Sequence, residues 1–225
     1  ERKVKPIRAR KLMKEVNGLW LPDSDTHFSG PDYEIGTRQV VLGLTKKRRL
    51  ALDVGAHVGI WTCHLADEFD EVISLEPNPE NFECLQKNTE GMGNVILRNE
   101  GASWTSDMMT LVHNREGNSG MWSLANPGEK VPGHKAYFVK VITIDSLALP
   151  DLDLIKIDAE GHEPGVLRGA ISTIERCRPV LCMEVKGNGV AYSLVSDAVN
   201  EALTNFSFEY HPHRVGSEII YTPAE

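Results

Sequence analysis

Acidic side chains recur where predicted strands end, so several of them could share one ligand. The apolar run 50–52 ends on Asp53, and the run 72–75 ends on Glu76. Parallel strands bring their carboxyl ends to one edge of a sheet, which is where open α/β sheets bind ligands. The sequence therefore predicts a site at this edge. The residues at or just after the ends of successive strands are Asp53, Gly55, Glu76, Asn99, Glu100, Asp158, Glu160 and Glu184.

The turn after Asp53 has the spacing Asp-x-Gly-x-x-x-Gly. This is neither the Gly-x-Gly-x-x-Gly of a dinucleotide-binding turn nor a phosphate loop with Lys-Ser/Thr. We expect glycines to let a ligand approach the main chain and backbone N–H groups to face it. A carboxylate here repels a pyrophosphate but suits a cationic ligand with an amino group, and S-adenosylmethionine has both features. The competing interpretation is a purely structural turn. The predicted cofactor contacts of this turn are Asp53, Gly55, Ala56, His57 and Gly59.

Glu76 lies 23 residues beyond Asp53. This is close to the ~20-residue spacing at which an acidic side chain binds ribose hydroxyls in nucleotide-binding sheets. A carboxylate accepts two hydroxyl hydrogens at once. We therefore predict that Glu76 and the neighbouring Pro77 lie beside a ribose.

The composition limits the class of protein. The chain has 225 residues, of which 41% are hydrophobic and 25% charged, as in an α/β domain with a full core. A net charge of −8 disfavours a nucleic-acid partner. Four cysteines without zinc-site spacing predict free thiols in a reducing compartment, and hence a cytoplasmic protein. No apolar run approaches the ~20 residues of a membrane span, so none is expected.

Strand and helix patterns alternate, which predicts an α/β fold with parallel strands and right-handed crossovers. Residues 99–149 interrupt this rhythm as a hairpin-like insertion. The predicted strands are 50–53, 71–76, 94–98, 107–112, 137–142, 152–158, 180–185, 206–210 and 218–221, and the helices follow Gly59 and Asn78 and cover 145–147, 164–177 and 190–204.

The N-terminal part differs from the rest. We predict an annex at 1–46 and the main domain at 47–225. Residues 1–17 are a basic leader, interpreted as solvated, residues 18–31 an irregular flap, and residues 32–44 a weakly helical segment.

The chain resembles the FkbM-type S-adenosylmethionine-dependent methyltransferases from about Leu50 to Val185. The resemblance rests on four blocks of sequence, of which the one around Asp158 is the most diagnostic. They are Leu-Asp-Val-Gly-Ala-His-Val-Gly-Ile-Trp-Thr at 52–62, Leu-Glu-Pro-Asn-Pro at 75–79, Gln-Lys-Asn at 86–88 and Asp-Leu-Ile-Lys-Ile-Asp-Ala-Glu-Gly-His-Glu at 153–163.

This resemblance implies a Rossmann-like class I methyltransferase fold: a mostly parallel seven-stranded sheet, helices on both faces and a β-hairpin insertion. It also implies methylation of a hydroxyl oxygen, on acceptors such as sugars, glycolipids and polyketides. By position, Asp53 and Gly55 would face the methionine part of the cofactor and Glu76 the ribose. Asn99, Glu100 and Gly101 would lie beside the adenine, and Asp158 near the sulfonium and the acceptor.

A hydroxyl acceptor must lose its proton, so a general base is expected. Asp158 is the first candidate, His162 the second and Glu160 the third. Asp158 and His162 have structural alternatives: a strand-end carboxylate caps a turn, and a lone histidine is often a surface residue. Glu163, before Pro164, suits a helix start.

Two further interpretations concern metals and acceptors. Asp158, Glu160, His162 and Glu184 could together ligate a divalent ion, but nothing fixes their geometry, and we predict no metal site. The aromatic and thioether side chains of the insertion suit either stacking on a sugar or packing onto the sheet. They are Trp104, Met121, Trp122 and Tyr137.

The sequence therefore predicts an O-methyltransferase that acts on a saccharide or a similar polyhydroxylated small molecule. The expected partner is a small-molecule or glycan acceptor, and a homo-oligomer is left open. The alternatives are a methyltransferase acting on nucleic acid or protein and a non-catalytic nucleotide-binding module. An NAD-linked oxidoreductase is disfavoured because the turn lacks the dinucleotide spacing.

Overall fold

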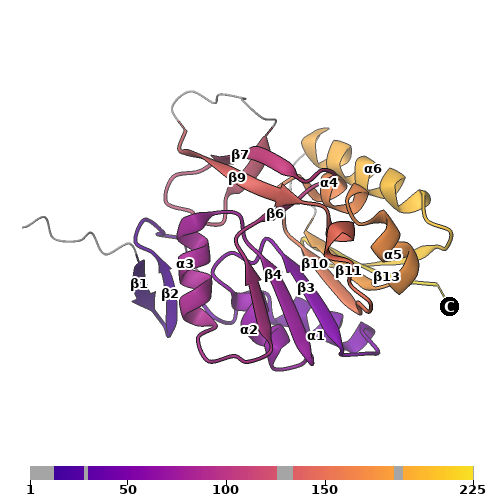
Figure 1. The fold of residues 1–225 in the computed structure, drawn as a ribbon, viewed down its shortest axis with the longest axis horizontal. Coiled ribbons are helices and arrows are strands. Elements are labelled where there is room, and N and C mark those ends of the chain that lie inside the picture. The colour runs from indigo at the N-terminus through magenta and orange to yellow at the C-terminus, as the bar shows by residue number, and fades with distance from the viewer. Residues whose placement is uncertain (1–12, 28–29, 126–133, 185–189, 225) are drawn as a thin grey trace, which may run out of the picture.

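The computed structural model describes residues 13–27, 30–125, 134–184 and 190–224. Most of the basic leader, at 1–12, therefore lies outside the described residues, as does the segment 126–133 of the insertion. The central sheet has seven strands in the order β12-β13-β11-β10-β3-β4-β5 (Figure 1). Strands β5, β4, β3, β10 and β11 run parallel, whereas β13 is antiparallel to both β11 and β12. The predicted mostly parallel seven-stranded sheet is thus confirmed.

The bounds of the sheet strands follow the apolar runs of the sequence. They are β3 Leu50–Val54, β4 Glu71–Leu75, β5 Val95–Arg98, β10 Leu154–Ile157, β11 Val180–Glu184, β12 Tyr210–Val215 and β13 Glu218–Pro223. The predicted strand 206–210 is wrong except at its last residue. Phe206 and Phe208 instead form an aromatic cluster with Tyr210, with ring centroids 5.1 to 6.2 Å apart.

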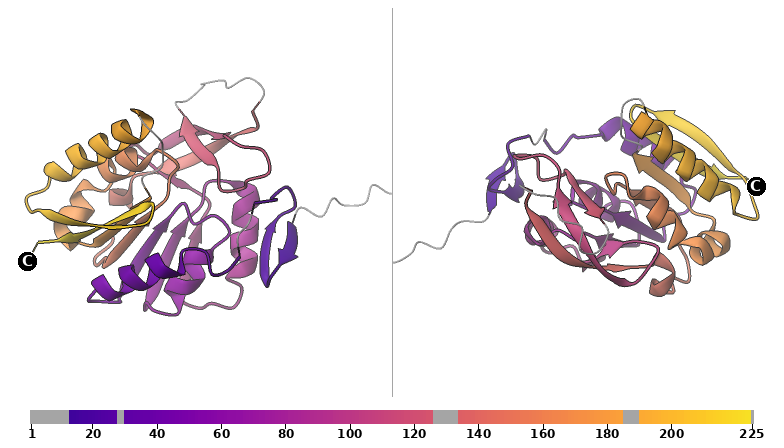
Figure 2. Two further views of the ribbon diagram at one scale, coloured as in Figure 1. Left: turned by 180° about the vertical axis from the view of Figure 1, so that it is seen from behind. Right: turned by 90° about the horizontal axis from the view of Figure 1, so that it is seen from above.

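Helices cover both faces of the sheet, because its strands alternate apolar side chains toward two cores. One core joins the β3 side chains Leu52 and Val54 to α4, α5 and α6. The other joins Ala51 of β3 to α1 and α2. Figures 1 and 2 show α4–α6 and α1–α2 on opposite sides. The helices are α1 Ile35–Leu44, α2 Ile60–Ala66, α3 Pro79–Asn88, η1 Ile144–Leu147, α4 Glu163–Arg168, α5 Ile171–Cys177 and α6 Val190–Thr204.

The predicted helix 164–177 is in fact two helices, α4 and α5, that meet at Gly169. A Cβ on Gly169 would lie 2.0 Å from the carbonyl oxygen of Ser103, so the chain passes against the insertion at this point. The irregular flap predicted at 18–31 begins instead within a hairpin, β1 Met13–Val16 with β2 Leu19–Pro22. Leu21 of β2 is buried with Cys84 of α3.

The insertion is larger than the predicted hairpin. It forms a four-stranded sheet in the order β6-β9-β7-β8, in which β7 and β9 are the two predicted strands. The bounds are β6 Gly101–Ala102, β7 Asp107–His113, β8 Trp122–Ala125 and β9 Ala136–Ile142. Because β6 follows β5 closely, the insertion extends over the carboxyl edge of the main sheet (Figure 1).

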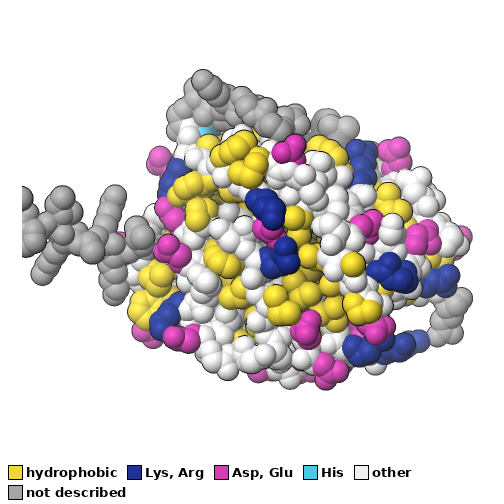
Figure 3. All heavy atoms as spheres, in the orientation of Figure 1, with side chains coloured by type: hydrophobic (Ala, Val, Ile, Leu, Met, Phe, Trp, Pro, Cys, Tyr) yellow, Lys and Arg dark blue, Asp and Glu magenta, His cyan; other side chains and the backbone are white. Residues whose placement is uncertain are grey.

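Lys/Arg and Asp/Glu side chains are interspersed over the face drawn in Figure 3, without a continuous basic patch among the described residues there. Among the described residues, no helix has the length and apolar character that crossing a membrane requires. The four cysteines are unpaired, as predicted, and two of them, Cys84 and Cys182, are buried.

Candidate functional site

The turn after β3 brings the main chain against the neighbouring strand end. Gly55 has a φ of 76°, and a Cβ there would lie 1.9 Å from the carbonyl oxygen of Asp158. Only glycine fits such an approach. Four N–H groups of this turn already have partners within the protein. The N–H groups of Gly55 and Ala56 donate to the carbonyl of Leu75, and those of His57 and Gly59 donate to Glu76 and Ala56.

Asp53 lies behind the turn and is fully buried. Its Oδ2 accepts a hydrogen bond of 2.7 Å from Thr62 Oγ1, and its Oδ1 lies 3.7 Å from the Nζ of Lys156. Burial raises the pKa of Asp53, and the Lys156 ammonium opposes that effect. Asp53 thus anchors the turn and does not line the pocket described below.

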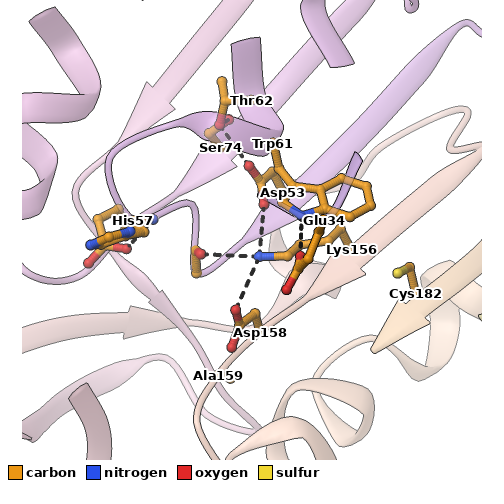
Figure 4. Close-up of polar contacts among 12 residues, drawn as sticks. Glu34, Asp53, His57, Trp61, Thr62, Ser74, Lys156, Asp158, Ala159 and Cys182 are labelled. Carbon is orange, nitrogen blue, oxygen red and sulfur yellow. Dashed lines mark hydrogen bonds and ion pairs between the residues drawn. The ribbon is translucent and has the colours of Figure 1, made fainter. Parts of the chain in front are cut away.

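Lys156 is a buried cation that the sequence analysis did not single out. Its Nζ lies 3.6 Å from Asp158 Oδ2 and donates to the Gly55 carbonyl at 3.4 Å (Figure 4). Burial alone would lower the pKa of Lys156, but Asp158 and Asp53 together raise it well above its ordinary value. Lys156 therefore stays charged and joins the turn to both carboxylates.

Glu76 follows β4 and is only 5% exposed. Its two carboxylate oxygens accept hydrogen bonds of 2.8 Å from the N–H groups of His57 and Asn78. Burial raises the pKa of Glu76 to about 7, and hydrogen bonds from Asn78, His57 and Asn81 oppose that rise. A carboxylate has about four lone pairs, so Glu76 keeps the capacity to accept a further hydrogen from a hydroxyl.

Glu76 borders a pocket of about 220 Å³ at the carboxyl edge of the sheet. Seven of the predicted site residues line it: Gly55, His57, Glu76, Pro77, Gly101, Asp158 and Glu160. The insertion adds an apolar wall made of Ala102, Leu111, Met121, Trp122 and Leu124. The pocket therefore has carboxylates on its sheet side and an apolar wall opposite.

One further group in this pocket lacks a partner. Asn81, in the first turn of α3, is 2% exposed, and its Oδ1 has no hydrogen-bond partner. A ligand that supplies a hydroxyl or amino donor would satisfy it. Together with the spare acceptor capacity of Glu76 and the apolar wall, Asn81 fits a nucleoside with free ribose hydroxyls and a flat base.

Two predicted adenine neighbours, Asn99 and Glu100, do not line the pocket. The Nδ2 of Asn99 donates to the Glu76 carbonyl at 2.7 Å. Glu100 accepts from Arg98 at 2.6 Å and lies 2.5 Å from the Nζ of Lys140. Burial works to raise the pKa of Glu100, but the hydrogen bonds from Arg98 and Lys140 lower it overall. Their side chains thus brace the Glu76 loop and the insertion.

The three candidate bases do not lie together. Asp158 and Glu160 line the pocket, and Glu160 has a left-handed φ of 51°. The ring of His162 points instead toward the insertion, where its Nε2 lies 2.9 Å from Ser103 Oγ and its centroid 5.0 Å from that of Trp104. Burial lowers the pKa of His162 to about 4. His162 is therefore neutral at pH 7.

Glu163 holds the loop that carries these residues. Its Oε1 accepts from the N–H groups of Ala159 and Gly161, at 3.0 and 3.1 Å. Burial raises the pKa of Glu163 to about 7.

Nowhere in the described part of the chain do three or more His, Cys, Asp or Glu side chains form a group that could hold a metal ion. Glu184, at the end of β11, does not line the pocket.

The structure separates the aromatic residues of the insertion into two sets. Trp122 is 8% exposed and stacks between His113 and Tyr137, at centroid distances of 4.4 and 5.3 Å. It therefore packs the insertion and also forms pocket wall. Trp104 is 48% exposed and lies beside His162.

Sequence reasoning missed Lys156, Asn81, Asp25 and Ser119. Lys156 carried a signal, since it is a lysine within the apolar strand Leu-Ile-Lys-Ile. Asp25 and Ser119 lie 94 residues apart, and only the path of the insertion brings them together.

Known proteins share sequence similarity with this chain. The sequence profile described as "Methyltransferase FkbM domain" matches residues 53–210. The hexuronic acid methyltransferase AglP of Haloferax volcanii is 29% identical over 128 residues, which are 55% of this chain and 50% of that protein. The chain thus spans about half the length of that curated relative.

Solved structures show the same fold. Methyltransferase FkbM from Methylobacillus flagellatus superposes with a TM-score of 0.54 at 19% identity, over 77% of this chain and 43% of that one. SMU.1697c from Streptococcus mutans, solved in complex with SAH, superposes with a TM-score of 0.53 at 12% identity, over 84% and 97% of the two chains. The predicted Rossmann-like methyltransferase fold is confirmed.

Proposed function

Because the chain belongs to the FkbM methyltransferase family, we propose that it transfers a methyl group from S-adenosylmethionine to a hydroxyl oxygen of a saccharide or similar polyhydroxylated small molecule. The observation that carries this proposal is the shared pocket of Glu76 and Asp158, which follow different strands of one sheet. Glu76 suits the ribose end of the cofactor, and Asp158 suits the place where the acceptor loses its proton.

The residues that would hold the cofactor follow from their contacts. Glu76 and the unpartnered Oδ1 of Asn81 accept hydrogen bonds from the nucleoside, and the apolar wall that includes Leu124 covers the base. Asp53 and Lys156 hold the turn on which Gly55 and His57 stand. The bound cofactor supplies an electrophilic methyl group on a cationic sulfur.

The protein's own contribution to the reaction is positioning and proton removal. Alignment of the acceptor oxygen with the methyl carbon is worth up to ~7–11 kcal/mol. Asp158 accepts the hydroxyl proton, with Glu160 as the next candidate at the same wall. His162 is less suited to act as the base, because its ring is hydrogen-bonded to Ser103 and does not line the pocket.

The acceptor class follows from two observations. The curated relative described above is named for a hexuronic acid, and the net charge of −8 disfavours a nucleic acid. We also propose that the protein works in the cytoplasm, since its four cysteines are unpaired thiols.

Calorimetric titration with S-adenosylhomocysteine tests the cofactor site. We expect the parent to bind and Glu76→Ala to bind at least about tenfold more weakly, because each hydrogen bond to a charged group contributes ~1.5–3 kcal/mol. Glu71→Ala is the matched control, since Glu71 is exposed at the other end of β4. A folded parent that does not bind would contradict the proposal. Transfer of labelled methyl groups to uronic acid glycans, to RNA and to protein would then distinguish the acceptor classes.

A further inference from the structure

Ser119 of the insertion uses every polar atom it has. It lies between β7 and β8 and is 6% exposed. Its N–H donates to Asp25 Oδ2 at 2.9 Å, and its hydroxyl donates to the same carboxylate. The Oγ lies 2.6 Å from His57 Nε2, and the carbonyl accepts from Asn81 Nδ2 at 2.8 Å. Since the hydroxyl proton goes to Asp25, the Nε2 of His57 is the donor to Oγ.

Two of these partners also contact Glu76. The backbone N–H of His57 donates to Glu76 Oε2 at 2.8 Å. Asn81 lies close enough for its hydrogen bond to oppose the burial that raises the pKa of Glu76. Ser119 is therefore joined to both neighbours of the carboxylate proposed to bind the ribose.

Residues 25–27 hold the same loop from the N-terminal side. The Thr26 N–H donates to the Gly117 carbonyl at 2.7 Å, and His27 Nδ1 lies 2.9 Å from that oxygen. Gly117 has a φ of 75°, and a Cβ there would lie 2.7 Å from Thr26 Oγ1. This contact thus needs a glycine.

The loop divides two cavities. Asn118 and Gly120, on either side of Ser119, line the cofactor pocket. Ser119 itself lines a second cavity of about 550 Å³, which shares Asn81, Asn118 and Trp122 with the first. If the contacts of Ser119 opened, the two cavities would join and the ribose side of the pocket would open.

We propose that Ser119 is a positioning residue for cofactor binding. It locks the insertion across the pocket and, through His57 and Asn81, fixes the carboxylate of Glu76. Cofactor exchange then requires the Ser119 contacts to open. This inference rests on the proposed function, because it assigns the pocket to S-adenosylmethionine.

Stopped-flow release of S-adenosylhomocysteine tests this role in Ser119→Ala. We expect release at least tenfold faster and binding weaker by a similar factor. Ser123→Ala is the matched control, since Ser123 lies on β8 of the same insertion and its Oγ accepts only from the exposed Asn114. Asp25→Asn should change release in the same direction as Ser119→Ala. If Ser119→Ala only lowered the stability of the fold, the folded molecules of that variant would release S-adenosylhomocysteine at the parental rate.

Hydrogen exchange on the ligand-free protein separates this inference from the proposed function. Ser119→Ala should speed exchange of the His57 amide and of residues 117–121, whereas Ser123→Ala should not. Release and exchange at parental values in Ser119→Ala would overturn the inference. A parent that does not bind S-adenosylhomocysteine would refute the proposed cofactor role, and unchanged exchange would then also show that Ser119 locks nothing.

Discussion

The Nζ of Lys156 lies 3.6 Å from Asp158 Oδ2. Lys156 also stands opposite Asp53 in the register of β10 and β3. Lys156 is thus a buried cation that pairs with two carboxylates: that of Asp158 at the pocket wall and that of Asp53 behind the turn. When both carboxylates are ionised, the three groups carry a net charge of −1, which suits a cationic cofactor.

Replacing Lys156 with Met should destabilise the fold by about 3–5 kcal/mol, because it leaves the buried carboxylate of Asp53 and the partly buried carboxylate of Asp158 without their cation. Urea unfolding would measure the change. Lys87→Met is the control: Lys87 is exposed and pairs only with Glu90, so its loss should cost about 0.5 kcal/mol or less. Adding Asp53→Asn to Lys156→Met should recover part of the stability. Equal stability of the Lys156→Met and Lys87→Met proteins would show that the buried pair is unimportant.

Asp158→Asn should lower turnover by about 10²–10⁴-fold, the usual contribution of a general base. The amide keeps the shape of the side chain but cannot accept the hydroxyl proton. Affinity for S-adenosylhomocysteine should stay within about threefold, so the effect would fall on kcat. Steady-state kinetics with a labelled methyl donor would measure it. Glu160→Gln and His162→Gln serve as comparisons, and undiminished turnover in Asp158→Asn would exclude Asp158 as the base.

The strand-end carboxylates could be predicted because each follows an apolar run, and a parallel sheet must bring such ends together. This reasoning placed Glu76 and Asp158 in one pocket. It could not place the N–H groups of Gly55 and Ala56, because their acceptor is a carbonyl of the neighbouring strand β4. That pairing depends on strand register, which the local sequence of the turn does not contain.

Tertiary contacts explain the other differences. The break between α4 and α5 arises where Gly169 meets the Ser103 carbonyl, and the periodicity of 164–177 carries no sign of it. Asp25 and Ser119 are ordinary polar residues of turn-rich segments. Their roles come from a hydrogen bond between parts of the chain that have no shared motif.

Gly55→Ala should destabilise the protein by at least about 2 kcal/mol. The new methyl group would meet the Asp158 carbonyl at 1.9 Å, and the φ of 76° is unfavourable for alanine. Gly43→Ala is the opposite case, since Gly43 is exposed in α1 with no atom near its Cβ position, and alanine should stabilise that helix by up to about 1 kcal/mol. Thermal unfolding of both variants would measure the contrast. Equal effects of the two substitutions would mean that the turn is looser than its geometry indicates.

The buried imidazole of His162 predicts a pH dependence of stability. Its folded pKa of about 4 lies below the ordinary value of 6.5, so the folded state binds fewer protons than the unfolded state between these values. The stabilising contribution is complete above pH 6.5 and is lost as the pH falls toward 4. At pH 5 the loss is about 2 kcal/mol, at 1.36 kcal/mol per pKa unit.

Urea unfolding of the parent and of His162→Gln at pH 7.5 and 5.0 isolates this effect. Glu76 and Glu163, whose raised pKa values of about 7 give the opposite slope, are present in both proteins and cancel in the difference. Stability of His162→Gln relative to the parent should therefore rise by about 2 kcal/mol on acidification, because glutamine does not titrate. His211→Gln, which removes an exposed histidine of β12, should change this difference little. A parallel loss of stability in the parent and in His162→Gln would show that the imidazole is accessible to protons, and would return His162 to consideration as the base.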